Sequence, residues 1–324
     1  MRILITGAAG MVGRKLAARL VQQGELRGKS LTAIDVVDVV ASEWPQGTVP
    51  FHAHVGDLAA PGFAERLMAL KPDVVFHLAG IVSGEAEANF DLGYRVNLDG
   101  TRMLFEAIRD ARKNPRVVFT SSIAVYGAPF PALIPDDFHL TPLTSYGTQK
   151  MMSEALLSDY SRKGIFDGIG IRLPTICVRP GKPNKAASGF FSNIIREPLL
   201  GQEAVLPVPR DVVHTHASPR SAVNFLILAA EIDTARLGPR RNLTMPGVGV
   251  TVQEQLDALR RVAGDKPLSL IREIPDATIW AIVKGWPTRF EAKRARDLGF
   301  EAEKDFDAII LAHIADELDG KLSQ

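Results

Sequence analysis

A tyrosine and a lysine four residues apart could form an acid–base pair in this sequence. Tyr146 and Lys150 lie in the segment Tyr-Gly-Thr-Gln-Lys, at the start of an amphipathic stretch in which positions i and i+4 share one helix face. A phenol with an ordinary pKa of about 10 is roughly 0.1% ionised at pH 7, so lowering the pKa to about 7 requires about 4 kcal/mol of preferential stabilisation of the phenolate. The Lys150 ammonium could supply part of it, which makes Tyr146 a candidate general base for an alcohol.

A serine is placed where it could hold the oxygen of that alcohol. Ser122 closes the run Phe119-Thr120-Ser121-Ser122, at the end of a strand expected to start near Arg116. Its hydroxyl would lie at the carboxyl edge of a sheet and could stabilise developing alkoxide charge. A Tyr-x-x-x-Lys pair alone is common by chance, so this interpretation depends on the elements around it.

Apolar runs of strand length alternate with amphipathic stretches of helix length through the first half of the chain. This alternation predicts a parallel sheet with helices on both faces. Strands are expected over residues 3–6, 31–35, 49–54, 74–78, 116–121 and 168–173, and helices over 11–23, 63–70, 92–112 and 145–163. Beyond about residue 175 prolines break the pattern, before a helix over 218–232, a strand over 241–245 and a final helical segment over 251–318.

A glycine-rich turn follows the first expected strand and opens the first helix. The spacing Gly-x-x-Gly-x-x-Gly allows a tight turn and a close approach of backbone amides to a pyrophosphate at a helix N-terminus. The alternative is an ordinary strand–helix turn. With a strand before it and a helix after it, the turn predicts a dinucleotide site formed by Gly7, Gly10, Met11, Val12 and Gly13.

An acidic residue closes the second expected strand. Asp35 stands where a carboxylate would accept hydrogen bonds from an adenosine ribose, although an aspartate there could also merely cap a loop. No lysine or arginine lies in residues 35–40, and Asp38 adds a further negative charge. A 2′-phosphate against Asp35 would meet repulsion of about 4 kcal/mol at 4 Å and an effective dielectric near 20. The predicted cofactor is therefore NAD rather than NADP.

Two further strand ends could contact this cofactor. Asp57 and Leu58 follow the third strand, where a carboxylate could accept from the adenine amino group while its neighbour packs on the ring. Leu78, Ala79 and Gly80 follow the fourth strand and offer small residues for backbone contact on the nicotinamide side, whereas His77 is interpreted as a structural histidine.

These patterns together predict an α/β protein with a doubly wound, Rossmann-type parallel sheet and a smaller, discontinuous α/β substrate-binding domain. The NAD-binding domain would contain residues 1–176 and 213–245, and the substrate-binding domain residues 177–212 and 246–324.

The same motifs, together with Asn97, the run 120–127 and Arg172-Leu173-Pro174, resemble the extended short-chain dehydrogenase/reductases, the NAD-dependent epimerase/dehydratase family. The resemblance implies that Tyr146 is the catalytic base, that Lys150 binds the nicotinamide ribose and lowers the tyrosine pKa, and that Ser122 positions the substrate hydroxyl. It further implies that Asn97 and Pro174 lie beside the cofactor and that homodimers form through the helices at 92–112 and 145–163.

Residues 172–191 resemble more narrowly those members that oxidise carbon 2 of a small sugar acid such as D-erythronate. A carboxylate substrate would need a cationic clamp, for which Arg179 is the candidate. Its hydroxyls could be bound by Ser83, Ser122, Thr175, Asn184 and Ser188. A nucleotide-sugar 4-epimerase with bound NAD remains an alternative, as does a regulator that senses NAD without turnover.

Charge and composition argue against several other classes of protein. Among 324 residues the net charge is +1, so no bulk field favours nucleic acid or an anionic membrane as a partner. The single cysteine, Cys177, excludes an intrachain disulfide and indicates a reducing, cytoplasmic setting. His214 and His216 share a strand face but have no third ligand nearby, so no metal site is predicted.

Overall fold

The structure, a computed structural model, describes residues 1–42, 44, 47–181 and 187–321. The chain forms two compact units. The first contains Met1–Val125, Pro142–Leu173 and Val223–Thr244, and the second contains Tyr126–Thr141, Pro174–Ala222 and Met245–Gln324. The expected domain boundaries differ from this division, because residues 126–141, 174–176, 213–222 and 245 belong to the second unit.

The first unit is built on one parallel sheet of seven strands in the order β12-β8-β7-β6-β1-β4-β5. Each neighbouring pair in the sheet is parallel. The strand order turns back at β1, the feature of a doubly wound sheet that creates a ligand crevice at the carboxyl ends of the strands. The strands are β1 (Arg2–Thr6), β4 (Ala33–Asp38), β5 (Phe51–Val55), β6 (Val74–His77), β7 (Arg116–Ser122), β8 (Asp167–Leu173) and β12 (Asn242–Thr244).

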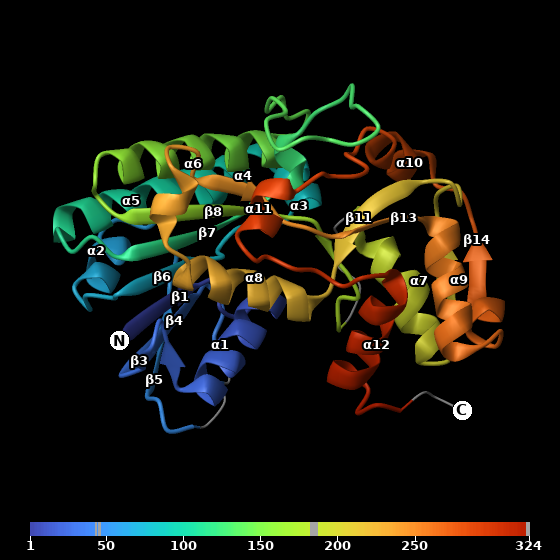
Figure 1. Ribbon diagram of the computed structural model, residues 1–324, viewed down its shortest axis with the longest axis horizontal. Coiled ribbons are helices and arrows are strands. Elements are labelled where there is room, and N and C mark those ends of the chain that lie inside the picture. Colours follow the sequence, from blue (N-terminus) through green and yellow to red (C-terminus); the bar gives the residue numbers. More distant parts are fainter. Residues whose placement is uncertain (43, 45–46, 182–186, 322–324) are drawn as a thin grey trace. The chain divides into compact units, whose positions relative to one another are not determined.

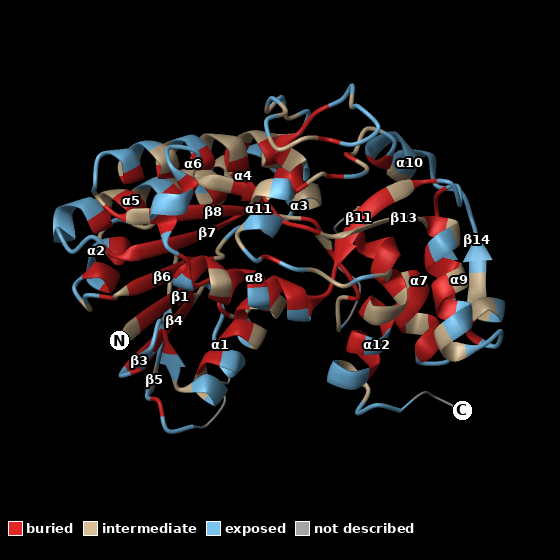
Figure 2. Cartoon of the chain, viewed as in Figure 1, coloured by how far each residue is buried: buried red, intermediate tan, exposed pale blue. Residues whose placement is uncertain are grey.

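Helices cover both faces of this sheet (Figure 1). One face carries α2, α5 and α6, and the other carries α1. On the face that carries α2, α5 and α6, buried residues of the strands and of these helices form one apolar core (Figure 2), as expected for parallel strands covered by helices. The helices of this unit are α1 (Met11–Gln23), α2 (Phe63–Met68), α3 (Ser83–Ala88), α4 (Phe90–Gly93), α5 (Gly100–Ala111) and α6 (Ser145–Arg162).

Three local features differ from the expected pattern or add to it. The expected helix over 92–112 is interrupted by a π-helical segment, η1 (Tyr94–Asp99), between α4 and α5. A short hairpin follows α1, and a 3₁₀ turn follows β7. These elements are β2 (Glu25–Leu26), β3 (Lys29–Ser30) and η2 (Ile123–Val125).

The second expected strand ends three residues later than the sequence pattern indicated. The register of β1 on β4 pairs Leu4 with Asp35 and Thr6 with Val37. Val36 and Val37 are both buried and continue the strand to Asp38. Asp35 therefore lies in the middle of β4, and the residue at its carboxyl end is Asp38.

The second unit has smaller sheets packed with helices. β11 (Val213–Ala217) lies between the antiparallel β13 (Val248–Thr251) and the parallel β9 (Thr175–Ile176), which explains why this part of the chain does not join the main sheet. A second pair consists of β10 (Ala204–Leu206) and β14 (Ile271–Glu273). Buried residues of α7, α9 and α12 share one apolar core.

The expected helical segment over 251–318 is wrong as a single element. Pro267, Pro275 and Pro287 interrupt it, since proline cannot donate the backbone hydrogen bond of a helix interior. The helix α8 (Pro219–Glu231) begins in this unit and ends in the first, where η3 (Thr234–Leu237) follows. The other helices of the second unit are α7 (Gly189–Leu199), α9 (Val252–Ala263), η4 (Pro267–Leu270), α10 (Ala277–Val283), α11 (Lys293–Asp297) and α12 (Phe306–Glu317). In the described part of the chain, no helix combines the length and apolarity that crossing a bilayer requires.

Candidate active site

The glycine turn between β1 and α1 has the geometry of a phosphate cradle. Gly7 has a φ of +69°, and a Cβ there would lie 2.6 Å from the backbone nitrogen of Ala79, so only glycine fits. Helix α1 begins at Met11 after Gly10, and the first-turn amides of Met11, Val12 and Gly13 have no acceptor within the helix. They are available to a pyrophosphate.

Asp35 is not placed to bind a ribose. Its side chain is fully buried, and its two oxygens accept from Arg2 Nε at 2.6 Å and Nη2 at 3.0 Å. His54 Nε2 lies 3.0 Å from the same carboxylate. Burial would raise the pKa of Asp35, but the hydrogen bonds from Arg2 and His54 outweigh it and hold the pKa below its usual value. This aspartate joins three elements inside the sheet, and the role assigned to it from the sequence is wrong.

Asp38 lies where Asp35 was expected. One carboxylate oxygen accepts the amide of Ala9, in the glycine turn, at 2.9 Å, and the other accepts the amide of Val39 at 2.8 Å. The carboxylate is therefore fixed at the carboxyl edge of the sheet, beside the turn. Two consecutive apolar residues after Asp35 were the sequence signal that could have moved the strand end to Asp38.

The loop after β5 contains Asp57 and Leu58, the two residues expected to contact an adenine ring. Asp57 accepts the amide of Ala59 at 2.9 Å and forms an ion pair with Arg95, so both of its oxygens already have partners within the unit. Leu58 is buried. An adenine ring could pack against this loop, but the Asp57 carboxylate also has a structural role there.

The backbone after β6, where the nicotinamide contacts are expected, packs closely against Asn97 and Lys150. A Cβ on Gly80 would lie 2.9 Å from Asn97 Oδ1 and 3.5 Å from Lys150 Nζ, so this backbone stands directly beside the expected catalytic lysine. Asn97 Oδ1 accepts the amide of Ile81 at 2.9 Å, and Asn97 Nδ2 donates to Gln149 Oε1 at 2.8 Å. The buried Gln149, which the sequence did not single out, fixes the orientation of Asn97.

His77 is a structural residue, as its position at a strand end indicated. The ring is buried, and its two nitrogens lie 2.7 Å from Thr6 Oγ1 and 2.9 Å from Thr101 Oγ1. Burial, with a further contribution from the Lys150 charge, lowers its pKa to about 3. The imidazole is therefore neutral at physiological pH.

Tyr146 and Lys150 lie on the first turns of α6, which packs against the turn that follows Ser122 at the end of β7. The Lys150 ammonium lies 5.8 Å from the centre of the Tyr146 ring and donates to the carbonyl oxygen of Thr120 at 2.9 Å. Ser122 Oγ accepts the amide of Ala124 at 3.1 Å. A Cβ on Gly147 would overlap the carbonyl oxygen of Ala124, so α6 approaches this turn closely.

Burial lowers the pKa of Lys150 to about 8, with Glu154 acting in the opposite direction. The ammonium is still mostly protonated at pH 7 and sits in a low-dielectric environment, where its effect on a nearby phenol is larger than in water. The arrangement can therefore stabilise a phenolate at Tyr146.

The remaining expected residues are distributed over both units. Pro174 follows β8, whose last residue Leu173 pairs with Ser122. Ser83, in the first unit, is the first residue of α3. In the second unit, Thr175 Oγ1 lies 2.7 Å from His214 Nε2. Arg179 donates through Nε to the carbonyl oxygen of Ile176 at 3.1 Å and through Nη2 to Ser188 Oγ at 3.3 Å. Asn184 lies outside the described residues.

His214 and His216 are both buried within the second unit. His214 Nδ1 lies 3.0 Å from the carbonyl oxygen of Pro287, and His216 Nε2 lies 2.9 Å from Gln255 Nε2. Burial lowers the pKa of His214 to about 4 and that of His216 well below its usual value. In the described ranges, no group of three or more histidine, cysteine, aspartate or glutamate side chains could hold a metal ion.

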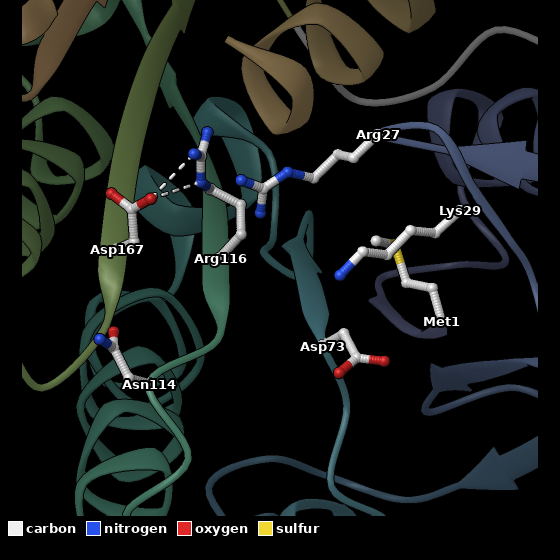
Figure 3. A pocket seen from close by; sticks show the side chains of 7 residues that line it. All are labelled: Met1, Arg27, Lys29, Asp73, Asn114, Arg116 and Asp167. Atoms are coloured by element: carbon white, nitrogen blue, oxygen red, sulfur yellow. Dashed lines mark hydrogen bonds and ion pairs between the residues drawn. The ribbon is translucent and has the colours of Figure 1, made fainter. Parts of the chain in front are cut away.

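A pocket of about 500 Å³ lies at the opposite, amino edge of the main sheet (Figure 3). Arg116 in this pocket forms an ion pair with Asp167 at 2.8 Å. Ligands of parallel sheets bind at the carboxyl ends of the strands, so this pocket is not the cofactor site. Its lining residues are Met1, Arg27, Lys29, Asp73, Asn114, Arg116 and Asp167.

The doubly wound sheet, the phosphate cradle and the tyrosine–lysine pair define an NAD-dependent oxidoreductase. The sequence of residues 3–221 matches the NAD dependent epimerase/dehydratase family, and the chain belongs to this family.

Relatives of known name agree with this assignment. The chain is 46% identical over 322 residues to the D-erythronate dehydrogenase of Cupriavidus necator, with 98% of each chain covered. It is 40% identical over 310 residues to the D-erythronate dehydrogenase of Haemophilus influenzae, covering 96% of this chain and 98% of that one.

Solved structures show the same fold. The crystal structure described as the nucleoside-diphosphate-sugar epimerase from Agrobacterium tumefaciens matches with a TM-score of 0.97 and 63% identity, over 100% of this chain and 96% of that one. The holo form of a GalE-like L-threonine dehydrogenase from Cupriavidus necator matches with a TM-score of 0.84 at 22% identity, over 98% and 99% of the two chains.

Proposed function

We propose that this protein is a dehydrogenase that oxidises the C2 hydroxyl of a small sugar acid, such as D-erythronate, to the 2-oxo acid, with NAD as the acceptor. The observation that carries the proposal is the buried Lys150 ammonium beside the Tyr146 ring, on a helix that begins against the end of β7. The two relatives named D-erythronate dehydrogenase support the choice of substrate.

In this proposal Tyr146 is the general base and Ser122 holds the reacting oxygen. The phenolate of Tyr146 takes the proton of the C2 hydroxyl as the carbon–oxygen bond becomes a carbonyl. Bound NAD supplies the acceptor for the hydrogen and two electrons that leave C2, so the products are the 2-oxo acid, NADH and one proton. Ser122 donates a hydrogen bond to the developing alkoxide.

The chain's own residues fit the cofactor. The cradle at Gly7 has room for backbone contact but none for a side chain, and the first-turn amides of α1 would hold the pyrophosphate. We assign the ribose contact to Asp38, whose carboxylate faces the turn. A carboxylate there would repel a 2′-phosphate, which supports NAD over NADP.

The contacts to the sugar acid are proposed for the residues that the sequence predicts. Arg179 is the proposed clamp for the substrate carboxylate, because a guanidinium matches a carboxylate with two parallel hydrogen bonds. The hydroxyl groups of Ser83, Thr175 and Ser188, with the side chain of Asn184, are proposed to bind the substrate hydroxyls. Exchange of Arg179 for methionine should raise KM for the sugar acid and leave the affinity for NAD unchanged.

A nucleotide-sugar epimerase is the second candidate, favoured by the description of the Agrobacterium tumefaciens structure. An epimerase returns the hydrogen to its substrate, so it produces no net NADH. A sensor of NAD would instead show no turnover with any substrate.

Absorbance at the NADH band separates these functions. Purified protein with NAD and D-erythronate should accumulate NADH, and Tyr146→Phe should lose 10²- to 10⁴-fold in kcat, the usual contribution of a general base, while binding NAD normally. The matched control is Tyr160→Phe. It removes the hydroxyl group of another tyrosine on α6, which donates a hydrogen bond to Glu106. Absence of NADH with erythronate, threonate and longer aldonates would refute the dehydrogenase, and epimerised UDP-hexose would support the alternative.

Assembly and location are part of the same proposal. We expect a homodimer formed by the helices around η1–α5 and α6, which light scattering would report as twice the chain mass. We also expect the protein to work in the reducing cytoplasm, where its single buried cysteine stays a thiol.

A further inference from the structure

A buried glutamate on α6 links the proposed catalytic helix to the strand that carries Ser122. Glu154 lies one helical turn beyond Lys150 and is 2% exposed. Its Oε1 accepts from Ser121 Oγ at 2.5 Å and from Arg172 Nε at 2.9 Å, and its Oε2 accepts from Arg172 Nη2 at 2.7 Å. The carboxylate is therefore bonded to β7 and β8 at once.

The residues at the end of β7 are fixed one after another. The carbonyl oxygen of Thr120 accepts the Lys150 ammonium, and the Ser121 hydroxyl donates to Glu154. Ser122 comes next. Two residues of α6, one turn apart, therefore hold the two residues that immediately precede the proposed substrate-binding serine. A shift of α6 along β7 would break both contacts together.

A buried ion pair is weak evidence for stability, because removing two charges from water costs about as much as their attraction returns. An apolar pair could fill the same space between α6 and β8. What an apolar pair could not do is anchor Ser121 or place a negative charge one turn from Lys150.

We infer that Glu154, held by Arg172, is a positioning residue of the active site: it fixes α6 against the end of β7 and keeps Lys150 charged. The inference rests on the function proposed above and extends it to a residue that touches neither substrate nor cofactor. It assigns two separable effects to Glu154, one geometric through Ser121 and one electrostatic on Lys150.

The electrostatic effect has a definite sign. Three titratable side chains interact with the Lys150 ammonium, namely Tyr146 and Glu154 on α6 and His77 on β6. Arg172 on β8 forms an ion pair with Glu154. His77 is neutral, and the Arg172 charge offsets only part of the Glu154 charge, because Glu154 still raises the pKa of Lys150. Glu154 therefore opposes the burial that lowers the Lys150 pKa to about 8. Without its charge, Lys150 should lose its proton at lower pH.

Glu154→Gln and Ser121→Ala separate the two effects. Glu154→Gln keeps the shape but removes the charge, so the alkaline limb of kcat against pH should move down by about one unit, and this effect should reduce kcat at pH 8 about 5-fold. Ser121→Ala keeps the charge, so kcat should fall several-fold with the alkaline limb in place. Glu106→Gln, a carboxylate-to-amide exchange on the neighbouring α5, is the control and should leave the pH profile unchanged.

The Lys150 pKa can also be followed without turnover, by NMR titration of ¹³C-labelled lysine ε-carbons with Lys150→Arg for assignment. A lower Lys150 pKa in Glu154→Gln supports the inference even if erythronate proves not to be the substrate. An unchanged Lys150 pKa, or a loss of kcat by the same factor at every pH, would overturn it. Should Glu154→Gln not fold, an unaltered kcat in Ser121→Ala would refute the geometric part.

Discussion

The carboxylate of Asp38 accepts the backbone amide of Ala9 at 2.9 Å. This contact ties the end of β4 to the glycine turn after β1, two segments that are 29 residues apart in the chain. It fixes an acidic group beside the place where the turn would bind a pyrophosphate. In the function proposed above, Asp38 would therefore select the cofactor.

Asp38→Ala should weaken NAD binding by about 10- to 100-fold, because hydrogen bonds to a charged acceptor contribute about 1.5–3 kcal/mol. The same change should narrow the preference for NAD over NADP, since the repulsion of a 2′-phosphate is removed. Isothermal titration with both cofactors measures the two effects. Equal losses of affinity for NAD and NADP would show that Asp38 only fixes the glycine turn and does not discriminate between the two cofactors.

Asp35→Asn tests the opposite role, that of a structural carboxylate. The substitution should cost about 1–3 kcal/mol of unfolding free energy at pH 7, because Arg2 and His54 lose their charged partner, while NAD affinity stays within about 2-fold. Since the folded pKa of Asp35 lies below its unfolded value, this stability is present above pH 3.8 and disappears as the pH falls through the folded pKa. The difference in unfolding free energy between wild type and variant, measured by urea unfolding, should be smaller at pH 3 than at pH 7.

Gly147→Ala should separate α6 from the turn after Ser122. The added methyl group would overlap the carbonyl oxygen of Ala124, so the helix start must shift, and shifts of about 1 Å near reacting groups cost up to about 10²-fold in rate. We expect kcat to fall by 10-fold or more. Gly285→Ala, where an added Cβ would lie 3.9 Å from the carbonyl oxygen of Ile282, serves as the control. Wild-type kcat in Gly147→Ala would contradict the close packing.

His77 should make the protein sensitive to acid. Its pKa is about 3 in the folded chain against 6.5 for the free side chain, so the unfolded state binds a proton that the folded state does not. The stability that His77 contributes is complete above pH 6.5 and is lost toward pH 3 at about 1.4 kcal/mol per pH unit. Below pH 6, His77→Gln should reduce the slope of the unfolding free energy against pH by the amount that corresponds to about one bound proton. His52→Gln, at an exposed histidine, should leave this slope unchanged.

Local patterns in the sequence were enough for the order of most elements of the first unit and for part of the site. The period of apolar residues predicted α1 and the strands of the main sheet, and the glycine turn was found because strand, turn and helix signals follow each other within a few residues. Helical spacing alone placed Tyr146 and Lys150 on one face of α6. These predictions depend on contacts close in sequence, which is why a single chain reveals them.

Contacts between distant segments decided the rest. Whether Asp35 or Asp38 lies at the strand end depends on the pairing of β4 with β1, and the partners of Glu154 come from β7 and β8. The membership of β11 in the second unit depends on its pairing with β13. Each of these depends on strand register and on which buried charges meet, quantities that arise only when segments far apart in the chain pack together.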